Sequence, residues 1–194
     1  MARRHASAPI SLWSAYTPAV PVSGTVWLVG MMGAGKSTVG PALARCMGRR
    51  FVDLDEEVER HARAAIVDIF EREGEAGFRG RERRAIERWS GAEVVMALGG
   101  GAIAQPGVAT RLQETGVVVY LRAQIDTLQQ RLGRGATRPL LRDLSAVERR
   151  ARLEALQAER EPAYERAGVT VDVDHGSVEC IARRALVALQ EVGA

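Results

Sequence analysis

The chain has 194 residues, of which 46% are hydrophobic and 26% charged, as in an ordinary folded domain. No apolar stretch approaches the length of about 18 residues that a membrane-spanning helix needs. The net charge of +3, with both signs mixed along the sequence, gives no argument for a nucleic-acid partner. Cys46 and Cys180 lack CxxC or metal-type spacing, so we expect buried thiols in a reducing compartment rather than a disulfide.

Residues 1–24 differ from the rest of the chain. They contain three prolines, no Asp or Glu, and no helical or strand period, so we expect a disordered arm followed by a single domain over residues 25–194. An arginine-rich, acid-poor arm leaves organelle targeting open as an alternative. The preference for arginine over lysine throughout the chain is instead typical of a GC-rich bacterial genome, and a cytoplasmic protein is the main expectation.

The domain alternates apolar strands with helix-forming segments. Strands are predicted at residues 25–29, 51–53, 93–98, 117–121 and 169–173. Helices are predicted at residues 37–47, 55–64, 66–72, 75–89, 106–114, 125–132, 145–160 and 178–192, with Gly48 and Gly74 as stops and a Ser145–Glu148 capping box. Nearly continuous apolar strands between helices indicate an α/β fold with a parallel sheet covered on both faces.

The segment Gly30–Thr38 fits the phosphate-binding template of Gly, four residues, Gly-Lys-Ser, directly after an apolar strand. Its glycines allow successive amide groups to point at one anion, and the helix that follows adds its positive end. Lys36 is the only lysine among the 27 basic residues, which makes a chance match improbable, although a simple glycine-rich turn is the alternative. The residues expected to bind the phosphates of a nucleotide are Gly33, Ala34, Gly35, Lys36, Ser37 and Thr38.

Asp53 and Asp55 follow the second predicted strand, two residues apart. One carboxylate can order Mg²⁺, with Ser37 as a further oxygen ligand, while the other accepts a proton from a hydroxyl nucleophile. The alternative for Asp55 is that it belongs, with its acidic neighbours, to a helix first turn that complements the helix dipole.

Further candidates lie at Gly99–Gly101 and in a set of arginines. Three glycines after a buried strand allow a substrate to approach the backbone closely, although a flexible turn is the alternative. Most arginines of such a chain are solvated surface residues. Four stand in contexts that suggest a ligand, namely Arg79, Arg131, Arg138 and Arg160. Arg138 falls within residues 133–144, a glycine- and arginine-rich stretch expected to form a mobile lid.

These segments together resemble the shikimate kinase family over about residues 24–190. The resemblance lies in Phe51–Asp55, Gly74–Glu82, Leu98–Ala102, Arg138–Leu141 and Arg160–Tyr164, which occur in the family's order. It implies a three-layer α/β/α fold with a five-stranded parallel sheet, similar to the nucleoside monophosphate kinases. The implied reaction is ATP-dependent phosphorylation of the 3-hydroxyl of shikimate in aromatic amino-acid biosynthesis, with ATP as co-substrate and Mg²⁺ as cofactor.

The resemblance also implies roles for single residues. Lys36, Asp55 and Arg138 would be catalytic, and Ser37 and Asp53 would serve magnesium. Arg131 and Arg138 would contact ATP, with Arg131 stacking on the adenine. Shikimate would be bound by Asp55, Arg79, Gly99, Gly100, Gly101 and Arg160, largely from a helical segment at about residues 55–82. A monomer without membrane or nucleic-acid partners is expected.

Two other functions stay open at this point. A related small-molecule kinase, for example one that acts on gluconate, would share the phosphate loop but would not need two arginines to bind a carboxylate. A metabolite-sensing module could keep the kinase fold without turnover. The presence of Lys36, Asp53, Asp55 and Arg138 argues against that module, because loss of catalysis would allow such residues to drift.

Overall fold

The computed structural model describes residues 22–133, 141 and 144–192. Its strands are β1 (Thr25–Val29), β2 (Arg50–Asp53), β3 (Val94–Ala97), β4 (Gly116–Arg122) and β5 (Val169–Asp172). Its helices are α1 (Lys36–Met47), α2 (Leu54–Ala62), α3 (Ile66–Trp89), α4 (Val108–Thr115), α5 (Ile125–Leu132), α6 (Ala146–Tyr164) and α7 (Val178–Val192).

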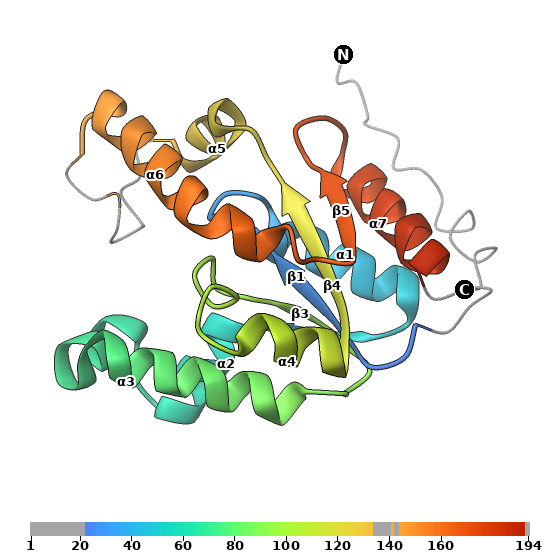
Figure 1. Cartoon of the computed structure of the whole chain (residues 1–194), viewed down its shortest axis with the longest axis horizontal. Coiled ribbons are helices and arrows are strands. Elements are labelled where there is room, and N and C mark those ends of the chain that lie inside the picture. The colour runs from blue at the N-terminus through green and yellow to red at the C-terminus, as the bar shows by residue number, and fades with distance from the viewer. Residues whose placement is uncertain (1–21, 134–140, 142–143, 193–194) are drawn as a thin grey trace, which may run out of the picture.

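The five strands form one parallel sheet in the order β2-β3-β1-β4-β5, which confirms the predicted fold. All five residues of β1 are buried, and Trp27 at its centre pairs in register with Met96 and Val118 on the two neighbouring strands. Helices α1 and α7 pack against each other, while α2 and α3 lie together at one end of the molecule (Figure 1). Because the strands are parallel, their carboxyl ends meet at one edge, where the loops after β1, β2 and β3 come together.

The predicted break at Gly74 is confirmed: α3 consists of two helical parts joined at Gly74, whose φ of 66° and ψ of −174° are not helical and favour glycine. One helix differs from the sequence-based expectation. Helix α6 continues four residues beyond Arg160 and includes Pro162, although proline lacks an amide donor. The buried Tyr164, stacked on Tyr120, stabilises this last turn. The predicted capping box at Ser145 and Glu148 is confirmed.

The start of the domain is attached to the core. Val22 is buried, and the Arg49 guanidinium donates hydrogen bonds to the carbonyl oxygens of Val22 and Gly24. Residues 1–21 of the predicted arm lie outside the described residues. The prediction of buried thiols is wrong for Cys180, which is exposed, while Cys46 is partly buried. None of the described helices is both long and apolar enough to cross a membrane.

Candidate active site

The loop after β1 is shaped to receive an anion. Gly33 and Gly35 have φ angles of 82° and 100°, and a side chain at Gly30 would lie 2.5 Å from the carbonyl oxygen of Leu121. Helix α1 begins at Lys36 with Gly35 as its N-cap, and within the described chain no side chain caps this end and no acid occupies its first turn. The positive end of α1 therefore faces the same space as the loop.

Lys36 folds back over this loop. Its Nζ donates hydrogen bonds to the carbonyl oxygens of Gly30 and Met31, at 2.7 and 3.0 Å, and its side chain lines a cavity. An ammonium held at the mouth of the loop lies where the negative charge of terminal phosphates would be placed.

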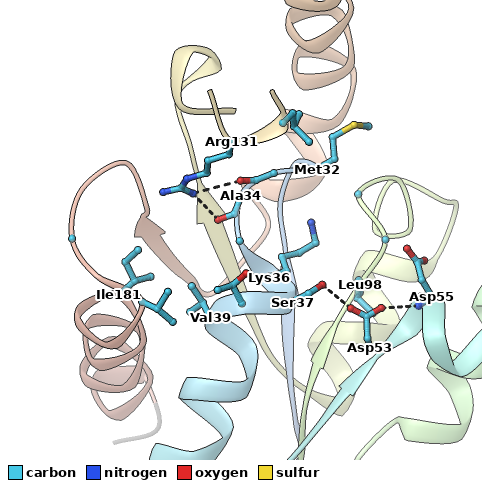
Figure 2. A pocket seen from close by; sticks show the side chains of 18 residues that line it. Met32, Ala34, Lys36, Ser37, Val39, Asp53, Asp55, Leu98, Arg131 and Ile181 are labelled. Carbon is cyan, nitrogen blue, oxygen red and sulfur yellow. Dashed lines mark hydrogen bonds between the residues drawn. The ribbon is translucent and has the colours of Figure 1, made fainter. Parts of the chain in front are cut away.

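Ser37 and Asp53 bring the loop and β2 together. The Ser37 hydroxyl donates to Oδ2 of Asp53 at 2.7 Å, while Oδ1 of Asp53 accepts from the Asp55 amide at 3.0 Å (Figure 2). Asp53 is thus the N-cap of α2, and Asp55 lies in the acidic first turn of that helix and also lines the cavity. The acidic-turn alternative for Asp55 therefore describes its place on the helix but does not remove it from the site.

The cavity has a volume of about 540 Å³, within the range of small-molecule sites. It extends from the phosphate loop to Asp55, Gly99 and Gly100 on one side, and to Gly176 and Ile181 on the other. In Figure 2, Ser37, Asp53 and Asp55 lie together on one side of Lys36, and Val39 and Ile181 lie on the other. One continuous space therefore joins the phosphate loop to Asp55 and to the first two glycines of the triplet.

Two arginines from different helices converge on the glycine triplet. A side chain at Gly101 would lie 3.3 Å from Nη2 of Arg79 on α3 and 3.5 Å from Nη2 of Arg160 on α6. One at Gly100 would lie 3.2 Å from Nη1 of Arg160. Arg160 is only 6% exposed, and its Nε is buried without a hydrogen-bond partner among the described residues. Two guanidinium groups at one point form a site suited to a carboxylate.

The sequence did not single out Glu82, which holds one of these arginines. Its Oε2 accepts from Nη1 of Arg79 at 2.7 Å and from Nε2 of Gln105 at 2.8 Å, and the side chain is fully buried. Burial raises the pKa of Glu82 and Asp55 adds to this effect, whereas the Arg79 guanidinium opposes it. The three-residue spacing from Arg79 on a helix was the signal that could have revealed this pair.

The remaining predicted arginines have different outcomes. Arg131 lines the cavity and donates hydrogen bonds to the carbonyl oxygens of Ala34, at 3.2 Å, and Val173. It therefore connects the phosphate loop to the chain after β5, and its role as an adenine-stacking residue stays a prediction. Arg138 and most of the predicted lid at residues 133–144 lie outside the described residues. Gly99 also lines the cavity, between Asp55 and Glu82.

The family model described as "Shikimate kinase" matches residues 32–190. The chain belongs to the shikimate kinase family. It is 44% identical over 166 residues to a shikimate kinase from Cereibacter sphaeroides, a match that covers 85% of this chain and 82% of that protein. It is 44% identical over 167 residues to one from Halorhodospira halophila, with coverage of 85% and 93%.

Solved structures agree with this assignment to the shikimate kinase family. The shikimate kinase from Acinetobacter baumannii in complex with shikimate superimposes with a TM-score of 0.80 at 38% identity, over 87% of this chain and 94% of that one. A gluconokinase from Sinorhizobium meliloti, at 23% identity and a TM-score of 0.53, shares the fold alone. The resemblance predicted from the sequence is therefore confirmed.

Proposed function

We propose that the protein transfers the γ-phosphoryl group of ATP to the 3-hydroxyl of shikimate, giving shikimate 3-phosphate and ADP, a step of aromatic amino-acid biosynthesis. The observation that carries the proposal is the convergence of Arg79 and Arg160 at Gly101, directly after Gly99 and Gly100, which line the same cavity as Asp55 and the phosphate loop. Shikimate has a carboxylate and three hydroxyls, so it needs cationic donors at one end and a hydroxyl acceptor at the other.

On the acceptor side, the two guanidinium groups bind the carboxylate and fix the ring. Asp55, which lines the cavity on the same side as Gly99 and Gly100, accepts a hydrogen bond from the hydroxyl that reacts. The amides at Gly99–Gly101 contact the ring closely because no side chain intervenes. This placement turns a reaction between two dissolved molecules into one between two held groups, which is where most of the rate enhancement in phosphoryl transfer arises.

On the nucleotide side, the amides of Gly33–Thr38 and the positive end of α1 bind the phosphate oxygens. Lys36 leaves its two carbonyl partners for the terminal phosphates, which present more negative charge. Arg131 lines the far part of the cavity near the base, and Arg138 completes the charge at the transferring group when the lid closes. These residues stabilise charge that spreads over the equatorial oxygens as transfer proceeds.

Ser37 and Asp53 are the residues that would hold Mg²⁺. A hydroxyl and a carboxylate oxygen 2.7 Å apart are hard donors of the kind that this ion takes alongside phosphate oxygens and water. Among the described residues, no group of three or more His, Cys, Asp or Glu side chains is placed to hold a metal ion. When bound, the ion neutralises phosphate charge.

In the transfer itself, the 3-hydroxyl oxygen forms a bond to the γ-phosphorus while the bond from that phosphorus to the β–γ bridging oxygen breaks. Asp55 orients the hydroxyl and takes its proton, and ADP leaves with the electron pair of the broken bond. The lid keeps water from competing as acceptor.

A coupled assay of ADP release tests this proposal with shikimate, gluconate and quinate as acceptors. ADP release that requires shikimate is the expected result, together with shikimate 3-phosphate as product. Turnover with gluconate but not shikimate would favour the related kinase, and binding of shikimate without turnover in the presence of ATP and Mg²⁺ would favour the sensing module.

The protein is further proposed to act in the cytoplasm as a monomer. One shikimate and one nucleotide site can be built from a single chain, so no second copy is needed to complete the cavity. The molar mass measured by light scattering during size-exclusion chromatography distinguishes a monomer from a dimer.

A further inference from the structure

Tyr164, the last residue of α6, connects that helix to the glycine triplet. Its side chain is fully buried, and its hydroxyl donates a hydrogen bond of 2.5 Å to the carbonyl oxygen of Gly100. Its ring stacks on Tyr120 of β4, with centroids 4.9 Å apart and an interplanar angle of 23°. The tyrosine is therefore fixed by packing, and the hydroxyl is directed at one backbone atom.

The same hydroxyl lies next to Arg160, one helical turn earlier on α6. Burial raises the pKa of Tyr164 to about 12, and the Arg160 guanidinium acts in the opposite direction. The phenol therefore keeps its proton near neutral pH and can donate it to Gly100. Arg160 in turn lies 3.2 Å from the position that a side chain at Gly100 would occupy. The Tyr164 hydroxyl, the Arg160 guanidinium and the Gly100 backbone thus lie next to one another.

A run of three glycines has no side chains with which to hold its own conformation, and glycine has the largest backbone freedom in the unfolded or mobile state. The loop that begins with the triplet continues to Gln105, which holds its other side. The Gln105 side-chain amide donates to Glu82, the residue that also binds Arg79. Two tethers therefore connect the loop to α3 and to α6, the two helices that carry the converging arginines.

We propose that Tyr164 is a positioning residue, whose hydroxyl locks Gly100 to α6 so that the loop backbone and Arg160 approach the acceptor's carboxylate as one unit. The identity of that acceptor rests on the proposed function. Tyr164 itself is not expected to touch the substrate. Without its hydroxyl, the Gly100 carbonyl loses its buried partner and the gap between Arg79 and Arg160 is no longer fixed.

The test compares Tyr164→Phe with Tyr120→Phe. Both keep the stacked rings, but the Tyr120 hydroxyl donates to Glu161 and not to the loop. For Tyr164→Phe we expect the KM for shikimate to rise about three- to ten-fold, as for loss of one hydrogen bond, with the KM for ATP and kcat within about two-fold. The KM ratio of methyl shikimate to shikimate should fall, because the carboxylate contact is what weakens. Tyr120→Phe should leave the KM for shikimate and the KM ratio of methyl shikimate to shikimate near their wild-type values.

An unchanged KM for shikimate in Tyr164→Phe, or an equal rise for ATP, would overturn the proposal. Hydrogen exchange of the amides at residues 99–105 in the substrate-free protein provides a readout that does not depend on the reaction. Faster exchange in Tyr164→Phe but not in Tyr120→Phe supports the tether, and equal exchange in all three proteins contradicts it. If the wild type fails to phosphorylate shikimate while exchange changes as expected, the proposed function is wrong and the tether stands.

Discussion

The Ser37 hydroxyl and the Asp53 carboxylate are joined by a hydrogen bond of 2.7 Å across 16 residues of sequence. This bond places the first turn of α1 against the end of β2, two strands away from the end of β1 in the sheet. Asp53 uses its other oxygen to cap α2 at the Asp55 amide. One carboxylate thus connects the start of α1, next to the phosphate loop, to the helix that carries Asp55.

Asp53→Asn separates the two roles of this carboxylate. Asparagine caps helices about as well as aspartate, so α2 should stay formed, whereas the charge proposed to serve magnesium is lost. We expect the Mg²⁺ concentration for half-maximal velocity to rise about ten-fold, the change for about 1.4 kcal/mol. Asp53→Ala should in addition lose about 1 kcal/mol of stability, because the cap is gone. Asp126→Asn, in an exposed pair with Arg150, is the control, and an Asp53→Asn variant with wild-type magnesium dependence would refute the assignment.

Lys36 is the single side-chain amine of this protein, which makes it a chemical probe of the site. An amine-directed reagent should inactivate the enzyme in proportion to labelling of Lys36, and ATP should slow both processes. Peptide mapping separates this label from the one on the N-terminal amine. Activity that survives complete labelling of Lys36 would exclude its role at the phosphates. Lys36→Ala should reproduce the loss of activity without the reagent.

Asp55→Asn tests the acceptor-side acid. The change keeps the size of the side chain but removes the proposed acceptor of the hydroxyl proton, so kcat should fall by a factor on the order of 10² or more while ATP affinity stays near the wild type. Nucleotide titration and steady-state kinetics measure the two quantities. Glu56→Gln, which neutralises the next acid of the same first turn, is the matched control. Weakened nucleotide binding with an unchanged kcat would show that Asp55 acts elsewhere.

Glu82→Gln tests the buried acid under Arg79. Because burial raises its pKa above the ordinary value of 4.5, the folded protein binds this proton more tightly than the unfolded chain does. The stability that this carboxyl contributes is fully present below its pKa in the unfolded chain. It is lost as the pH rises through its pKa in the folded protein. The melting temperature of Glu82→Gln should therefore increase relative to the wild type as the pH is raised from about 4.5 to neutrality.

The control for this pH series is Glu75→Gln, because Glu75 also pairs with Arg79 but is mostly exposed. Its melting-temperature difference from the wild type should change little over the same range. The idea is contradicted if the melting temperature of Glu82→Gln minus that of the wild type stays constant or falls as the pH rises. Either result would show that the carboxyl ionises at least as readily in the folded protein as in the unfolded chain. A higher KM for shikimate in Glu82→Gln is expected separately, since Arg79 loses its charged partner.

The phosphate loop and the individual strands were predictable because both depend on local sequence. A strand of five buried residues, a glycine pattern and Lys36 are contiguous, and their geometry follows from backbone rules that operate over a few residues. The stop at Gly74 was partly predictable for the same reason, since its positive φ requires glycine, but whether the two helical parts form one kinked element depends on what they pack against. The passage of α6 through Pro162 was not predictable from local propensity, because burial of Tyr164 outweighs it.

By itself, the sequence determined the fold class, the phosphate loop, the acids after β2 and the family. Only the tertiary structure decided that Arg79 and Arg160 meet at Gly101, that Glu82 and Gln105 hold one side of the glycine triplet, and that Tyr164 holds the other. The physical reason is that these contacts join residues from separate helices and a loop, and their distances depend on how the helices pack on the sheet. A pattern along the chain specifies what each segment forms, while packing specifies which side chains share one buried space.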